Sequence, residues 1–194
     1  GKSKYNAGMD PKAYWNKKHP KYAQESWIDK PTIFAKFATT YFPRSGTLLD
    51  LGAGQGQDSR YFAKLGYEVV SADFSEEALR IGKNKAKKEN VKLKIINLDI
   101  SKSLPFPDVN FDIVYSHLAL HYFDDKTTKK IFREIHRVLK PKGIFATLFN
   151  TMEDPEVKQS KKIEGGLYDT NGLAKRFFSL DYLQRKINGK FKVL

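Results

Sequence analysis

Short apolar runs alternate with longer amphipathic stretches through the middle of the chain. The apolar runs predict buried strands at 47–51, 67–72, 92–98, 111–115 and 144–149. Between them, apolar residues at helical spacing predict helices at about 57–65, 76–88 and 126–139. Strands that alternate with helices are typical of a parallel sheet covered by helices on both faces. The sequence therefore predicts an α/β fold of three layers with a mainly parallel sheet.

Residues that prefer helix ends support these boundaries. Ser75 is a suitable N-cap, and the two glutamates after it lie in the first turn, where the helix dipole favours negative charge. Gly66 fits the position just past a helix. The sequence Lys-Pro-Lys-Gly at 140–143 predicts the end of the helix before the last strand.

The N-terminal flank has a different composition from the predicted sheet. Residues 1–45 are polar and rich in aromatic side chains, and we expect a cap of short helices that belongs to the same domain as 46–194. Pro31 favours the start of a helix that continues to about Tyr41, because proline is well tolerated in the first helical turn. No internal repeat or domain break is visible, so 194 residues indicate one domain.

The C-terminal flank offers little material for more strands. The segment 151–172 is polar and contains glycine, and we expect it to be a mobile loop over the site. The stretch 179–186 predicts a helix with Ser179 as its N-cap, and 191–194 has the composition to begin a strand. We therefore expect an incomplete sheet edge near the C-terminus, with fewer than seven paired strands. An uncovered edge favours pairing with another chain, so the sequence is compatible with either a monomer or a homodimer.

Composition excludes several classes of protein. Apolar residues make up 40% of the chain and charged residues 29%, which is typical of a soluble globular protein. No apolar run is long enough to predict a membrane span and no secretory signal is visible, so we expect a cytoplasmic location. The absence of cysteine excludes disulfides, thiolate metal sites and cysteine nucleophiles. The four histidines show no metal-ligand spacing, and we expect no metal site.

The net charge of +13 bears on possible partners. Lysines cluster at 83–94 and 158–162 and could hold a nucleic acid or another anionic surface. No basic-aromatic motif or helix-turn-helix pattern organises this charge, so a solvated surface is the preferred interpretation. Nucleic acid stays open as a partner.

The most informative stretch is Asp50–Asp58, with the sequence DLGAGQGQD between a predicted strand and a predicted helix. Its glycines lack the Cβ atoms that would keep a ligand from the backbone, and the helix that follows presents unpaired N–H groups. This pattern predicts a nucleotide-like cofactor at the sheet edge. The spacing is G-x-G-x-G rather than the G-x-G-x-x-G of dinucleotide sites, and Asp50 and Asp58 would repel a pyrophosphate. Both suit a cationic cofactor, such as an amino acid with a sulfonium, and disfavour a dinucleotide dehydrogenase.

From this turn onward the chain resembles the class I S-adenosylmethionine-dependent methyltransferases, in particular the small single-domain type that acts on small molecules. The resemblance covers about residues 45–150 and implies a Rossmann-like fold with S-adenosylmethionine as cofactor and S-adenosylhomocysteine as product. Five stretches carry it, in the order and spacing of the family: Leu48–Asp58, Glu68–Ser75, Leu98–Ile100, Leu104–Tyr122 and Arg133–Phe149.

The resemblance also implies a role for each acid at the strand ends. Asp73 would accept hydrogen bonds from the two ribose hydroxyls, Asp99 would accept from the adenine amino group, and Asp50 would lie at the methionine end. The alternatives are a helix-capping role for Asp73, an ordinary turn aspartate for Asp99 and a strand-end turn residue for Asp50. Asp112 matches a structural acid of the family. The candidate cofactor residues are Asp50, Gly52, Ala53, Gly54, Asp58, Asp73, Phe74, Asp99, Ile100, Ser116 and His117.

Candidates for handling a proton and binding the acceptor lie outside the glycine-rich turn. His121 and Tyr122 are the candidate catalytic residues, because a histidine of near-neutral pKa can take a proton from an attacking hydroxyl or amine. The alternative for His121 is packing under the lip of the site. Tyr14 and Trp15 of the aromatic cap are candidate acceptor contacts, and ordinary packing is again the alternative.

The resemblance implies direct displacement, in which a nucleophile attacks the sulfonium methyl group in line. Residues 116–119 read Ser-His-Leu-Ala and lack the Asn/Asp-Pro-Pro-aromatic tetrad of some amino-directed methylases. The preferred hypothesis is methyl transfer to an oxygen, nitrogen or sulfur atom of a small molecule. The alternatives are an RNA- or protein-directed methyltransferase and a non-catalytic cofactor-binding module.

Overall fold

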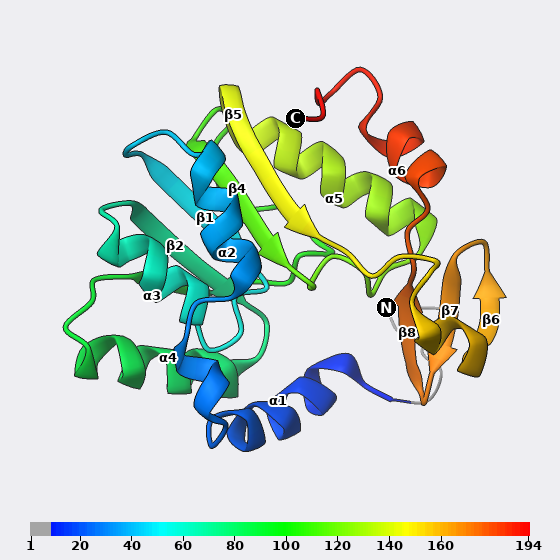
Figure 1. Ribbon diagram of the computed structural model, residues 1–194, viewed down its shortest axis with the longest axis horizontal. Coiled ribbons are helices and arrows are strands. Elements are labelled where there is room, and N and C mark those ends of the chain that lie inside the picture. The colour runs from blue at the N-terminus through cyan, green and yellow to red at the C-terminus, as the bar shows by residue number, and fades with distance from the viewer. Residues whose placement is uncertain (1–8) are drawn as a thin grey trace.

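A computed structural model describes residues 9–194 and has a parallel five-stranded sheet at its centre (Figure 1). The first eight residues of the predicted cap lie outside the described part. Every strand pair in this sheet is parallel, as the alternation of strands and helices predicts. In spatial order the strands are β3 (Lys94–Asn97), β2 (Glu68–Asp73), β1 (Thr47–Leu51), β4 (Phe111–His117) and β5 (Leu139–Leu148).

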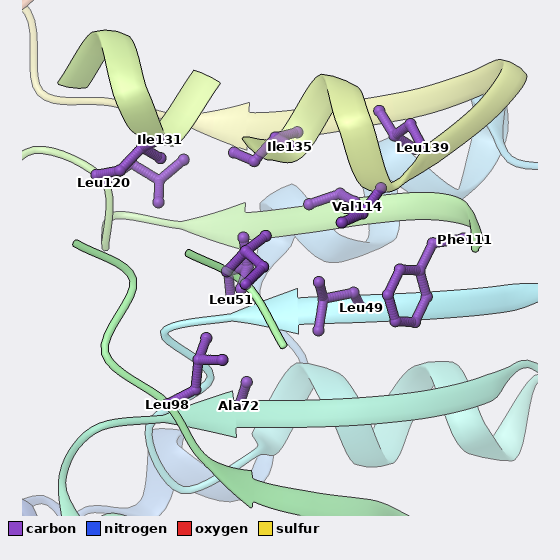
Figure 2. Close-up of a cluster of buried hydrophobic side chains, with 12 residues drawn as sticks. Leu49, Leu51, Ala72, Leu98, Phe111, Val114, Leu120, Ile131, Ile135 and Leu139 are labelled. Carbon is purple, nitrogen blue, oxygen red and sulfur yellow. The ribbon is translucent and has the colours of Figure 1, made fainter. Parts of the chain in front are cut away.

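Helices cover both faces of the sheet. On one face, Ile131 and Ile135 of α5 (Asp125–Val138) belong to one buried cluster with Leu49 of β1 and Val114 of β4 (Figure 2). On the other face, α2 (Ile33–Ala38) and α3 (Gln57–Lys64) enclose a second core around the fully buried Phe62. The helix α4 (Glu76–Lys88) packs along β2 and β3. Burial of these apolar stripes is the main force that holds the three layers together.

The predicted helix ends occupy their expected places. The hydroxyl of Ser75 accepts a hydrogen bond from the N–H of Ala78 and caps α4. Gly66 follows the last residues of α3 with a φ of +97°, a conformation that favours glycine. The helix α5 ends at Val138, and β5 begins at once, so 140–143 belong to the strand and not to a loop.

The N-terminal cap is more regular than the sequence suggests. Its first helix, α1 (Pro11–Tyr22), has three turns and is capped by Asp10. Thr32, not Pro31, precedes α2, and its hydroxyl accepts a hydrogen bond from the N–H of Ala35. Two short 3₁₀ helices complete the cap, η1 (Ser26–Asp29) and η2 (Thr39–Tyr41).

The segment predicted to be a mobile loop, 151–172, is largely ordered structure. It contains η3 (Pro155–Gln159) and most of a three-stranded antiparallel sheet. Its last turn is Asn171-Gly172, where both residues have positive φ, the geometry of a tight hairpin turn. The expectation of a loop is wrong because cross-strand pairing compensates for the weak apolar pattern. The strands are β6 (Lys161–Glu164), β7 (Leu167–Thr170) and β8 (Leu173–Arg176).

Near the C-terminus, α6 (Leu180–Ile187) is capped by Ser179 as predicted. Residues 191–194 form no strand, contrary to expectation, and Phe191 packs on Phe145 and His136 instead. Among residues 9–194 the central sheet has five strands and ends at β5, which confirms its predicted incomplete edge. The limit of fewer than seven paired strands is wrong for the described chain, because the separate small sheet adds three strands. None of the described helices combines the length and apolarity needed to cross a membrane.

Candidate functional site

A cavity of about 1550 Å³ lies where the carboxyl ends of the parallel strands meet. Its wall includes residues from the ends of β1, β2, β3 and β4, from α1 and from the small sheet. Ligand sites of open parallel sheets commonly occupy this position, because the connections diverge there. The candidate cofactor residues in the wall are Asp50, Gly52, Ala53, Gly54, Asp58, Asp73, Phe74, Asp99, Ile100 and His117.

The glycine-rich turn brings bare backbone to this cavity. Gly52 has a φ of +72°, and its N–H donates a 2.8 Å hydrogen bond to the carbonyl of Ala72. The N–H of Ala53 donates to the same carbonyl over 2.9 Å. A Cβ on Gly52 would lie 2.2 Å from the Cβ of Ala119, so only glycine fits between the turn and the loop after β4.

Asp73 is buried at the end of β2 and fixes two neighbouring segments. Its Oδ2 accepts a 2.8 Å hydrogen bond from the N–H of Gly54, and its Oδ1 accepts one of 2.8 Å from the N–H of Ser75. Burial raises the pKa of Asp73, and these N–H donors and nearby His19 act against that rise. Each oxygen retains acceptor capacity toward the cavity, since a carboxylate oxygen has two lone pairs.

Asp50 is fully buried at the end of β1. Its Oδ2 accepts a 2.6 Å hydrogen bond from the hydroxyl of Ser59. Burial, with smaller contributions from the nearby Asp58 and Asp73 carboxylates, raises the pKa of Asp50 to about 8 against the opposing effect of the Ser59 hydrogen bond. A cationic ligand beside Asp50 would lower this pKa, because a nearby cation stabilises the ionised form of a carboxyl group.

Asp99 combines the two interpretations that the sequence left open. It forms a turn with Ser101, whose N–H and hydroxyl donate to Oδ1 over 3.0 and 2.6 Å. It also lies in the cavity wall beside Phe74 and Ile100. Within residues 9–194, Oδ2 takes part only in a long 3.7 Å contact with Lys102, so this oxygen is available to a ligand.

Two candidate cofactor residues have structural partners. Asp58 accepts hydrogen bonds from the N–H and hydroxyl of Thr32 and from the hydroxyl of Tyr115, which ties the cap to β4. Ser116 donates a 2.8 Å hydrogen bond to the carbonyl of Leu51, and its side chain is buried outside the cavity wall. Asp112 binds Thr47 and Lys140, which agrees with a structural role.

His121 and Tyr122 both line the cavity. The side chain of His121 is 1% exposed, and neither ring nitrogen has a hydrogen-bond partner in the described part of the chain. Burial, with a smaller contribution from the charge of Lys175, lowers the pKa of His121 to about 3. The expectation of a near-neutral histidine is therefore not met. Burial raises the pKa of Tyr122, so both side chains are neutral at pH 7.

Of the aromatic cap residues, Trp15 and Trp27 line the cavity and Tyr14 does not. The ring of Tyr14 packs edge-on against Trp15 at 5.2 Å between centroids, which is the packing role left open by the sequence. The indole of Trp15 in turn contacts Tyr122, with 5.8 Å between ring centroids. The cap thus reaches the segment that follows β4.

Several residues of the cavity wall were not predicted from the sequence. His19 of α1 is buried beside Gly54 and Asp73, and its carbonyl accepts a 2.7 Å hydrogen bond from the amide of Gln55. Lys175 reaches the cavity from β8. The Asn-Gly turn at 171–172 is a local signal for that hairpin, whereas no local pattern indicates His19.

Comparisons with known proteins agree with this geometry. The family model described as "Methyltransferase domain" matches residues 49–147, half of the chain. A YcgJ protein of Bacillus subtilis, an uncharacterized methyltransferase, is 34% identical over 56% of this chain and 42% of its own. A malonyl-[acyl-carrier protein] O-methyltransferase of Enterobacter lignolyticus is 28% identical over 88% of this chain and 64% of its own. The chain thus spans less than two thirds of the length of either relative.

Among solved structures, the PH0226 protein of Pyrococcus horikoshii is similar in fold, with a TM-score of 0.70. The match covers 86% of this chain and 87% of that one at 23% sequence identity. The parallel sheet and its layers are therefore shared over nearly the whole length of both chains.

Proposed function

Because the chain belongs to the class I S-adenosylmethionine-dependent methyltransferases, we propose that its cavity aligns S-adenosylmethionine with a small-molecule acceptor for direct methyl transfer. The observation that carries the proposal is the meeting of Asp50, Asp73 and Asp99 at one cavity beside bare glycine backbone. These residues come from the ends of three neighbouring parallel strands, and all three line the same cavity.

The residues present fit the cofactor. Asp73 would hold the ribose and Asp99 the adenine edge, while Phe74 and Ile100 offer apolar contact to the base. Asp50 would face the cationic methionine end, because it is buried with a hydroxyl and no lysine or arginine as partner among residues 9–194. Gly52 and Gly54 admit the ligand close to the backbone.

The acceptor would bind at the other end of the cavity, between Trp15, Tyr122 and the strands β7 and β8. S-adenosylmethionine supplies a methyl group that is already reactive, since it is attached to a positively charged sulfur. The protein's part is then alignment and exclusion of water, which can lower a barrier by ~7–11 kcal/mol.

A small molecule is favoured over a macromolecule because buried side chains form part of the wall at the acceptor end. His121 and Leu167 lie in this wall with almost no solvent exposure. The name of the Enterobacter lignolyticus relative, an O-methyltransferase, supports an oxygen nucleophile.

Ligand-dependent stabilisation tests the proposal. Thermal unfolding would be followed with S-adenosylmethionine, S-adenosylhomocysteine, NAD and NADP. A ligand at ~100 times its dissociation constant adds ~2.7 kcal/mol to the free energy of unfolding, so a clear rise in Tm is expected with either adenosyl compound. Stabilisation by NAD or NADP without any effect of the adenosyl compounds would overturn the proposal.

A further inference from the structure

The acceptor end of the cavity is rich in hydrogen-bond donors. The hydroxyl of Tyr122 and the imidazole of His121 line it, and neither His121 ring nitrogen has a partner within residues 9–194. A buried polar group without a partner costs about 1–3 kcal/mol, so it gains when water or a ligand atom supplies the missing hydrogen bond. His121 therefore offers a hydrogen-bonding group to a polar atom of the acceptor.

Lys175 adds a positive charge to the same wall. Its ammonium donates a 2.6 Å hydrogen bond to Glu156, which leaves two of its three donors for other partners. The next residue, Arg176, donates its main-chain N–H to the carbonyl of His121 over 2.6 Å. This bond fixes the position of β8 relative to His121, and the charge of Lys175 contributes to the lowered pKa of His121.

The carboxylates near this end all have partners in the described part of the chain. Glu156 binds Lys175, and Asp124 caps α5 by accepting from the N–H of Thr127. Asp154 accepts from the N–H of Glu156 and from the amide of Asn150. The acceptor end thus offers donors and a cation, and its described carboxylates are engaged with Lys175, with the first turn of α5 or with the turn at 154–156.

We propose that the methyl-accepting group is a carboxylate, bound by Lys175 and hydrogen-bonded by His121, on a molecule whose apolar part contacts Leu167, Leu173 and Trp15. The inference rests on the proposed function and specifies its substrate class. The carboxylate oxygen forms the new bond to the methyl carbon as the methyl–sulfur bond breaks, and the electron pair of that bond goes to sulfur. A carboxylate and a sulfonium become a neutral methyl ester and a neutral thioether, so no proton has to be moved.

The other nucleophiles fit this wall less well. An alcohol or a thiol must lose a proton, and His121 is too weakly basic to take it at neutral pH. An amine is mostly a cation at neutral pH, and a protonated amine has no lone pair to accept a hydrogen bond from Lys175 or to attack the methyl group. The two remaining donors of Lys175, by contrast, match the lone pairs of a carboxylate.

Binding to the complex with S-adenosylhomocysteine tests the inference without requiring turnover. Linear carboxylates of four to ten carbons would be titrated by calorimetry, each beside the primary alcohol and the primary amine of the same length. We expect the carboxylates to bind at least roughly tenfold more tightly, as for a charge-assisted hydrogen bond. Lys175→Met should remove that preference, Lys175→Arg should retain part of it, and Lys162→Met, on the exposed β6 strand of the same sheet, should leave it unchanged.

The outcomes separate the two proposals. If S-adenosylhomocysteine does not bind, the proposed function fails. If it binds but alcohols or amines bind as tightly as the carboxylates, the substrate class is wrong. A folded Lys175→Met protein that still prefers carboxylates also overturns the inference, as does faster S-adenosylhomocysteine formation from S-adenosylmethionine with an alcohol or amine than with the matching carboxylate.

Discussion

The main-chain N–H of Gly54 lies 2.8 Å from Oδ2 of Asp73, and this hydrogen bond joins the glycine-rich turn to the end of the neighbouring strand. One carboxylate thus sets the shape of the turn while it faces the cavity. The turn and the acid that we assign to the ribose are therefore a single structural unit.

Asp73→Asn should weaken binding of S-adenosylmethionine by roughly tenfold or more, because hydrogen bonds to a charged group contribute ~1.5–3 kcal/mol. The amide keeps one acceptor oxygen but replaces the other by a donor, which opposes the N–H of Gly54 or of Ser75. Isothermal titration calorimetry measures the affinity. Asp181→Asn on the exposed face of α6 is the control, and equal affinity in both variants would remove Asp73 from the site.

Asp50→Asn should change how stability depends on pH. The pKa of Asp50 is raised from its ordinary value of 3.8 to about 8, mainly by burial. Between these values the folded state holds a proton that the unfolded state has lost, so the stabilisation is fully present below pH 3.8 and is lost as pH rises through about 8. The asparagine variant has no ionisable side chain at this position. Its free energy of unfolding, measured with urea, should therefore fall less steeply with pH than that of wild type between pH 5 and about 8.

The same ionisation couples Asp50 to its ligand. A cation beside Asp50 favours the carboxylate, so S-adenosylmethionine should release protons on binding near pH 7 and bind more tightly as pH rises toward about 8. Calorimetry in buffers of different ionisation enthalpy counts these protons. Equal release by wild type and Asp50→Asn would show that another group titrates.

Gly52→Ala should destabilise the protein more than a positive φ alone explains. The left-handed conformation costs about 1–2 kcal/mol for a residue with a side chain, and the new Cβ would also lie 2.2 Å from that of Ala119. Gly189→Ala is the matched control, because Gly189 has the same φ of +72° with nothing within 4 Å of its Cβ position. Urea unfolding compares the two variants, and an equal decrease in their free energy of unfolding would contradict the close approach of Ala119.

Arg176→Met should lower the free energy of unfolding by about 3 kcal/mol or more, because buried acceptors lose their donor. The guanidinium of Arg176 is fully buried and donates to the carbonyls of Phe123 and Gly165 and to Glu164. These bonds attach the small sheet to the segment after β4. Hydrogen exchange at 121–123 should rise in the variant, while Arg185→Met on the surface of α6 should leave it unchanged.

His121→Phe should alter the acid side of the stability profile. The pKa of His121 is lowered from 6.5 to about 3 by burial, so the unfolded state binds an extra proton between these values and stability rises with pH across that window. Phenylalanine cannot titrate, so unfolding of the variant should take up fewer protons, by up to one, in this pH range. Its free energy of unfolding should therefore rise less steeply with pH. Burial also lowers the pKa of His19 and His117, so the free energy of unfolding of the variant should still depend on pH in this range.

In wild type, the His121 ring should show no titration by NMR between pH 5 and 8. A His121 resonance that titrates near pH 6.5 would contradict its burial and restore the possibility of a near-neutral base.

Local pattern was sufficient for much of the fold. The strands β1, β2 and β4 and the helices α3, α4 and α5 lie within a few residues of their predicted bounds, because each buries an apolar stripe. The strands of the small sheet were missed because their sequences, such as Lys-Lys-Ile-Glu at 161–164, carry little apolar alternation. These strands form because they pair with one another, and the only local signal for that pairing is the Asn-Gly turn at 171–172.

The sequence by itself determined the parallel sheet and the bare turn at 52–56, because apolar periodicity and glycine act over a few neighbouring residues. Only the tertiary structure decided which side chains surround the cavity. It placed His19 beside Gly54, paired Asp58 with Thr32 and Tyr115, and brought Lys175 to the wall that holds His121. These contacts join segments that are far apart in the chain. They depend on how the elements pack together, so local sequence patterns do not predict them.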